Sequence, residues 1–87
     1  MEMAETLRWE TVEVTCSEEG TYKDVGLSSV GAVTATAFYK YSNESSAWNQ
    51  EEGEPDLKDD GTISVYCGSP YGTGYQKYWL VTVGYER

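Results

Sequence analysis

Residues 30–41 read Val-Gly-Ala-Val-Thr-Ala-Thr-Ala-Phe-Tyr-Lys-Tyr, and this stretch decides the fold class. From Val33 to Tyr41 the odd positions carry only valine, alanine and tyrosine, while the even positions carry threonine, phenylalanine and lysine. Because successive side chains of a strand point to opposite faces, this alternation of β-branched and aromatic residues predicts a half-buried strand. A helix would place Val33 and Lys40 on one face and so mix apolar with charged side chains.

The N-terminal residues 7–16 alternate in the same way, but the apolar positions change phase once. Leu7 and Trp9 are odd, whereas Val12, Val14 and Cys16 are even. A one-residue change of phase within a strand is what a β-bulge produces, so we expect a bulge at residues 10–11. The alternative is that residues 7–9 form a separate short piece. Residues 21–25 predict a short second strand, and residues 26–29 a loop.

Two more strands are expected near the C-terminus. Asp60 and Gly61 form a hairpin-type turn signal before residues 62–67, and residues 77–85 place Trp79, Val81 and Tyr85 on one face. Between them, residues 68–76 are rich in glycine and other turn formers. We expect these two strands to form an antiparallel hairpin across that loop. Three apolar side chains fall on the outward faces, where they cover a second apolar layer or form a contact surface: Phe38, Tyr66 and Leu80.

The connection from residue 44 to residue 60 shows no periodicity and carries most of the charge. It holds seven acidic residues and one lysine, a net charge of −6 out of −9 for the chain. Ser45 or Ser46 can cap a short helix near residues 46–52, which Gly53 and Pro55 would end. We expect Trp48 to pack beneath this connection and so anchor it to the rest of the domain.

These patterns together predict an all-β fold. The 87 residues form a single domain, 1–87, with a small antiparallel sheet of about four to six strands. We expect the sheet to curl into a sandwich or a partly open barrel, with at most the one short helix near residues 46–52.

Cys16 and Cys67 are the two cysteines, and each falls on an apolar phase at the end of a predicted strand. We expect them to face each other in the core. In the cytosol they would be two buried thiols, which we favour; in a secreted protein they would form a disulfide.

The composition argues against an enzyme. The chain has no histidine, so neither the usual general base nor a nucleophile paired with histidine can be assembled. Residues 56–67 resemble a calcium-binding loop only superficially, because Lys58 and Cys67 stand where such a loop needs oxygen ligands. We therefore expect no cofactor and no dedicated metal site.

The charge also limits the partners. A net charge of −9 repels nucleic acid and anionic lipid, so we expect no direct binding to either. Residues 1–5 are acidic where a signal peptide needs positive charge, which favours a cytoplasmic location; a secreted mature form is the alternative.

What remains is a protein-binding function, in which the acidic connection and a tyrosine-rich hairpin dock on a larger protein with a basic surface. In its sharpest form, the protein is a stoichiometric inhibitor that mimics nucleic acid towards a protein that handles it. The alternatives are a structural β-domain that assembles through a strand edge or the Phe38–Leu80 patch, with homo-oligomers, and an extracellular recognition domain pinned by a disulfide. The expected contact residues are Glu51, Glu52, Glu54, Asp56, Asp59, Asp60, Tyr66, Tyr71, Tyr75 and Tyr78.

Overall fold

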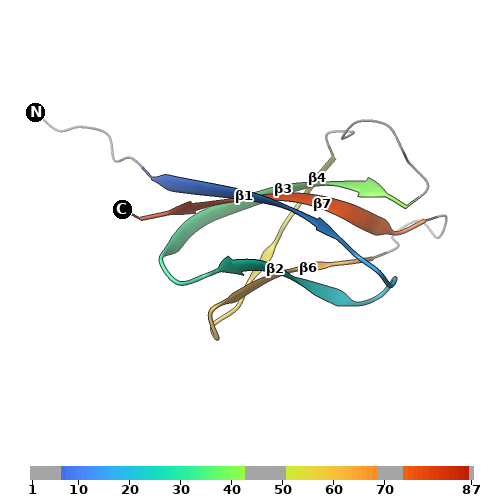
Figure 1. Cartoon of the computed structure of the whole chain (residues 1–87), viewed down its shortest axis with the longest axis horizontal. Helices are drawn as coiled ribbons and strands as arrows, with labels where there is room; N and C mark the ends of the chain where they lie inside the picture. The colour runs from blue at the N-terminus through green and yellow to red at the C-terminus, as the bar shows by residue number, and fades with distance from the viewer. Residues whose placement is uncertain (1–6, 43–50, 69–73, 87) are drawn as a thin grey trace, which may run out of the picture.

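The computed structural model describes residues 7–42, 51–68 and 74–86, and these form an all-β sandwich of two antiparallel sheets. The four-stranded sheet has the order β1-β7-β3-β4 and the three-stranded sheet the order β2-β6-β5. The two sheets lie as separate layers that do not close into a barrel (Figure 1), so the all-β prediction is confirmed and the sandwich form is the one adopted. The strands are β1 (Arg8–Thr15), β2 (Tyr22–Ser28), β3 (Ala32–Tyr41), β4 (Glu51–Gly53), β5 (Asp56–Leu57), β6 (Thr62–Tyr66) and β7 (Gln76–Tyr85).

The core lies between the sheets and follows the alternation of the strands. On β7 the side chains of Val81 and Val83 have no exposed surface, and Ile63 and Val65 of β6 match them from the other sheet. β3 and β7 are the two central strands of their sheet and pair in register from Thr34 opposite Gly84 to Lys40 opposite Tyr78. The period-2 pattern therefore located these strands and their inward faces correctly, except at the start of β3. There the register shifts between Ala32 and Thr34, and Val33 is 53% exposed.

The bulge expected in the first strand is absent. β1 pairs with β7 without a break from Arg8 opposite Tyr85 to Thr15 opposite Tyr78. Trp9 lies on the outer face, 54% exposed, beside Gly84: a Cβ atom at Gly84 would lie 3.0 Å from the Trp9 ring. The apolar phase changes because Trp9 covers a glycine on the outer face, not because the backbone bulges.

β2 continues through the segment predicted to be a loop. Its register shifts between Asp24 and Ser28, and Gly26 within this irregularity has φ of +82°. Glycine adopts this conformation without the penalty that a Cβ atom imposes. The strand therefore reaches Ser28 by means of a local bulge.

The predicted hairpin between the last two long strands is also wrong. β6 pairs with β2 and β5, whereas β7 pairs with β1 and β3, so the connection between them crosses from one sheet to the other. Paired in one sheet, Val65 and Val81 would have shared one apolar face that still needed a cover. Placing the strands in opposite sheets lets each face cover the other.

The acidic connection contains strands that its sequence did not predict. β4 pairs with β3 at the edge of one sheet, and β5 pairs with β6 at the edge of the other. The predicted helix is wrong at Glu51 and Glu52, which belong to β4; the rest of it, including Trp48, lies outside the described residues.

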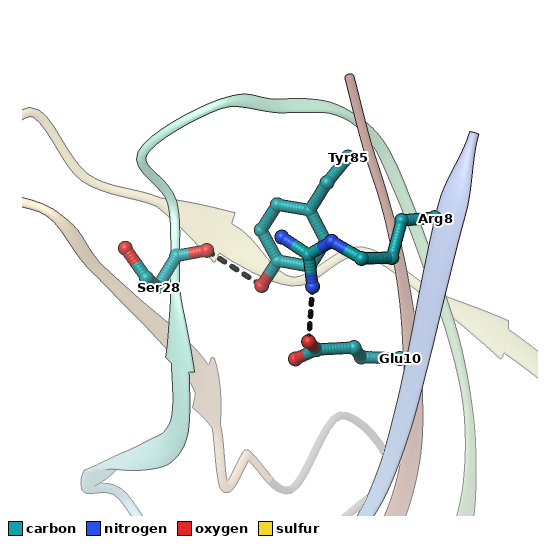
Figure 2. Close-up of polar contacts among 4 residues, drawn as sticks. All are labelled: Arg8, Glu10, Ser28 and Tyr85. Atoms are coloured by element: carbon teal, nitrogen blue, oxygen red, sulfur yellow. Dashed lines mark hydrogen bonds and ion pairs between the residues drawn. The ribbon is translucent and has the colours of Figure 1, made fainter. Parts of the chain in front are cut away.

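Two clamps join the sheets at opposite ends of β7. At one end Cys16 and Cys67 form a disulfide, in place of the two thiols that we favoured, and both are at most 1% exposed. At the other end the Tyr85 hydroxyl donates a 2.7 Å hydrogen bond to the Ser28 carbonyl of β2. Figure 2 shows the Arg8 guanidinium over the Tyr85 ring, 4.5 Å from its centroid, and paired with Glu10.

Candidate functional site

Two exposed tyrosines stand side by side on the outer face of the three-stranded sheet. Tyr22 of β2 and Tyr66 of β6 are direct register partners, and their ring centroids lie 4.9 Å apart. Tyr22 is 61% and Tyr66 46% exposed, so both rings are open to solvent. The Tyr66 ring lies against Gly68, where a Cβ atom would approach it to 2.8 Å. This glycine lets the ring lie close to the backbone.

The next row of the same face holds two aspartates. Asp24 of β2 and Asp56 of β5 are both register partners of Ser64, which lies between them on β6. Both aspartates are exposed, and one Asp24 oxygen accepts a 2.7 Å hydrogen bond from the amide of Gly26. Residues directly opposite each other on neighbouring strands share a face, so these carboxylates flank the tyrosine pair.

Lys58 brings a cation onto this face. Its amide donates a hydrogen bond to the Thr62 carbonyl, which places Lys58 beside the start of β6, yet its ammonium lies 5.2 Å from the centroid of the Tyr22 ring. The line from Lys58 to Tyr22 therefore crosses β6 diagonally at Ser64. Ser64 on this line is 4% exposed, and its hydroxyl has no hydrogen-bond partner among the described residues. We call this surface the tyrosine face and define it by Tyr22, Asp24, Asp56, Lys58, Ser64 and Tyr66.

Acidic turns border the tyrosine face at both ends. Glu18 and Glu19 are exposed in the turn before β2, and Asp59 and Asp60 in the turn before β6. Asp60 has a structural role, because its Oδ1 accepts hydrogen bonds from the amide and the hydroxyl of Thr62. These bonds hold the pKa of the Asp60 carboxyl below its usual value.

The structure brings together only some of the predicted contact residues. Tyr66, Asp56, Asp59 and Asp60 lie on or beside the tyrosine face, and Glu54 lies between β4 and β5. Glu51 and Glu52 lie on β4 in the other sheet, and Tyr71 falls outside the described residues.

Tyr75 and Tyr78 are placed away from this face. Tyr75 packs against the core. Tyr78 lies on the outer face of the four-stranded sheet, with the ammonium groups of Lys40 and Lys77 at 5.4 and 5.5 Å from its centroid. Of the predicted tyrosines that the structure describes, Tyr66, Tyr75 and Tyr78 therefore do not form one cluster.

Four members of the tyrosine face were not among the predicted contact residues: Tyr22, Asp24, Lys58 and Ser64. Tyr22 and Asp24 lie on β2, whose pattern was too short to show which side chains face outward. The signal for Tyr22 and Asp24 is the pairing of β2 with β6, which joins residues between 34 (Ser28 with Thr62) and 44 (Tyr22 with Tyr66) positions apart.

The outer face of the four-stranded sheet is the other broad surface. Phe38 and Leu80 are register partners there, both half-buried, as expected for the patch named from the sequence. Beside them lies a shallow pocket of about 180 Å³, whose lining includes Glu13, Thr15 and Lys40.

Neither surface carries a metal-binding cluster. Within residues 7–42, 51–68 and 74–86 no group of three or more histidine, cysteine, aspartate or glutamate side chains is arranged to hold a metal ion. The same residues contain no helix with the length and apolar character that a membrane crossing requires.

Comparison with known proteins gives no match: no family model, no curated protein and no solved structure matches the chain.

Proposed function

We propose that this protein is a small non-enzymatic binding module that docks its tyrosine face on the basic surface of a larger protein. The observation that carries the proposal is the exposed pair Tyr22–Tyr66, with aspartates in the adjacent row of the same sheet. Tyrosine is enriched among the residues that dominate binding energies, and a surrounding rim of charge steers the encounter and selects the partner.

The net charge supports a basic partner. The chain carries 15 acidic and 6 basic residues, and residues 51–60 alone hold six acids against Lys58. Glu51 and Glu52 on β4 and Asp56 on β5 belong to edge strands, and Glu54, Asp59 and Asp60 lie in the short segments next to these strands. In the sharpest form of the proposal, the partner handles nucleic acid and the protein occupies the groove that receives phosphates.

The test compares two variants that lose the same charge. In Asp56→Asn/Asp59→Asn the charge is lost at the tyrosine face; in Glu13→Gln/Glu86→Gln it is lost elsewhere, and all four residues are exposed. Each protein is immobilised and exposed to the heparin-binding fraction of a host lysate, and bound proteins are eluted with rising salt.

We expect wild type and control to retain the same basic protein, which duplex DNA displaces and which leaves the tyrosine-face variant at lower salt. Retention of one protein by all three baits with equal salt dependence, or of none by wild type, would overturn the proposal.

A second function has its own support in the four-stranded sheet. Trp9 is 54% exposed on the outer face that also carries Phe38 and Leu80, which favours an assembly domain that pairs through this face. Analytical ultracentrifugation tests it: a dimer that Trp9→Ser abolishes supports assembly, and a monomer at all concentrations contradicts it.

The disulfide bears on where either function operates. Disulfides persist in oxidising compartments and are rare in the cytosol, so the Cys16–Cys67 bridge favours the extracellular alternative over the cytoplasmic expectation. Mass spectrometry of alkylated protein from its native host distinguishes the two, because a protein with free thiols gains two alkyl groups without prior reduction.

A further inference from the structure

We propose that the tyrosine face contains a binding position for one lysine or arginine side chain of the partner, and that Lys58 occupies this position in the free protein. This inference rests on the proposed function and specifies it, because it names the chemical group that is recognised and the atoms that recognise it.

The Lys58 ammonium marks the position on the ring of Tyr22. It lies 5.2 Å from the centroid of Tyr22, within the distance at which a cation is attracted to the face of an aromatic ring. A position that accepts the chain's own ammonium has the shape and charge to accept another. Lys58 is exposed and extends from a turn, so it can leave without unfolding a strand.

The groups around that position also favour a cation. The ring centroid of Tyr66 lies 4.9 Å from that of Tyr22 and widens the aromatic platform, and Asp24 and Asp56 lie in the adjacent row, on either side of Ser64. The tyrosine face thus carries two carboxylates and one lysine, so it keeps an excess of negative charge while Lys58 is in place. A second cation is therefore attracted to it.

The Ser64 hydroxyl supplies a hydrogen-bond acceptor in the same row of the face. It is buried between the two aspartates and has no hydrogen-bond partner among the described residues, although buried hydroxyls are generally paired. When Lys58 moves off its diagonal path, this oxygen becomes available to a donor. An ammonium or guanidinium N–H supplies that donor.

If Lys58 competes with the partner, removing it must strengthen binding. The probe is pentalysine, with pentaglutamine as the uncharged control, followed by the NMR shifts of the Tyr22 and Tyr66 ring protons. Lys58 competes with the strength of an exposed cation–π contact to Tyr22. Removing it in Lys58→Met should therefore tighten pentalysine binding about two- to fivefold.

The matched control is Lys23→Met. Lys23 neighbours Tyr22 on β2 and is exposed, but it is the register partner of the buried Val65 and so belongs to the other face of the sheet. It changes the net charge by the same amount as Lys58→Met, and any gain from general attraction appears equally in both variants.

Three variants test the binding groups themselves. Tyr22→Leu and Asp24→Asn/Asp56→Asn should each weaken binding about two- to fivefold, while Tyr22→Phe, which keeps the ring, should leave it unchanged. Asparagine retains the oxygen that accepts the Gly26 amide, so the backbone at Asp24 is preserved.

The outcomes separate this inference from the function on which it rests. Equal effects of Lys58→Met and Lys23→Met, or ring shifts that do not move with pentalysine while backbone shifts elsewhere do, overturn the lysine position and leave the binding module standing. No binding of pentalysine by any variant at low salt overturns both.

Discussion

The hydroxyl of Tyr85 forms a hydrogen bond that joins the two sheets at one end of the sandwich, and its contribution to stability can be measured. It donates to the Ser28 carbonyl at 2.7 Å from a side chain that is only 3% exposed. Tyr85→Phe keeps the ring beneath Arg8 and removes only this bond. We expect the free energy of unfolding to fall by about 1 kcal/mol, measured by urea denaturation. An unchanged midpoint would show that water replaces the hydroxyl without loss.

The same residue predicts a loss of stability in alkali. Burial raises the pKa of the Tyr85 phenol above its usual 10.0, and the Glu10 carboxylate adds to this effect. Because the pKa of Tyr85 is higher in the folded state, its contribution to the free energy of unfolding is fully present below pH 10. This contribution is lost as the pH rises through the folded pKa. We expect urea midpoints to fall above pH 10 more steeply in wild type than in Tyr85→Phe. Parallel pH profiles would contradict this assignment.

Asp60 and Asp59 are neighbours with different roles, and two alanine variants distinguish these roles. Asp60 accepts two hydrogen bonds from Thr62, whereas Asp59 is an exposed residue of the same turn. We expect Asp60→Ala to lower the thermal midpoint and Asp59→Ala to leave it within error. The Asp60 pKa is lowered by folding, so its contribution is present above its unfolded value of 3.8 and is lost as the pH falls through the folded pKa.

Among the strands, β4 depends on a single glycine. A Cβ atom at Gly53 would lie 2.8 Å from the ring of Trp79, which is 3% exposed and whose indole N–H donates to the Gln76 carbonyl. Because the Trp79 ring is buried and its indole is hydrogen-bonded, the backbone of β4 must shift instead of the ring. We expect Gly53→Ala to destabilise the protein by about 1–3 kcal/mol and to displace β4 from β3. Hydrogen exchange at residues 37–39 measures that displacement, with Glu54→Ala as the control; equal protection in both variants would contradict it.

How much of the sandwich the sequence reveals depends on the length of each strand. β3 and β7 have ten residues each, so their alternation identifies both the strand and its buried face. β4 and β5 have three and two residues, too few to show any period. Their positions are set by what they pair with: β4 lies beside β3, and β5 lies beside β6.

The candidate site was only partly predictable for a related reason. Tyr66 and Asp56 stood out by residue type, but their neighbours Tyr22 and Asp24 are brought to them by pairing across more than thirty residues. The expected β6–β7 hairpin would have joined Tyr66 with Tyr78; the crossing between sheets places them on opposite outer faces. Local pattern identifies a strand, whereas only the topology identifies its neighbour.

For the whole molecule, the disulfide and Tyr85 stabilise the same contact between sheets from two ends. Cys16 and Cys67 close a loop of 51 residues, and removing such a link costs about 4 kcal/mol in the chain-entropy model. Ten residues of β7 separate the Cys16 end from Tyr85, a distance of about 30 Å along an extended strand. Contacts so far apart are expected to contribute independently.

Reduction and Tyr85→Phe should therefore add. We expect the reduced variant to lose the sum of the two separate losses, within about 0.5 kcal/mol, by urea denaturation in sucrose, which stabilises every form enough to be measured. Excess phosphine reductant throughout the measurement keeps the thiols from pairing again without adding groups to two buried cysteines, and oxidised Tyr85→Phe is the control. A combined loss well below the sum would mean that opening one end already releases the other. The two sheets would then separate in one cooperative step, and the disulfide and the Tyr85 hydrogen bond would not stabilise the protein independently.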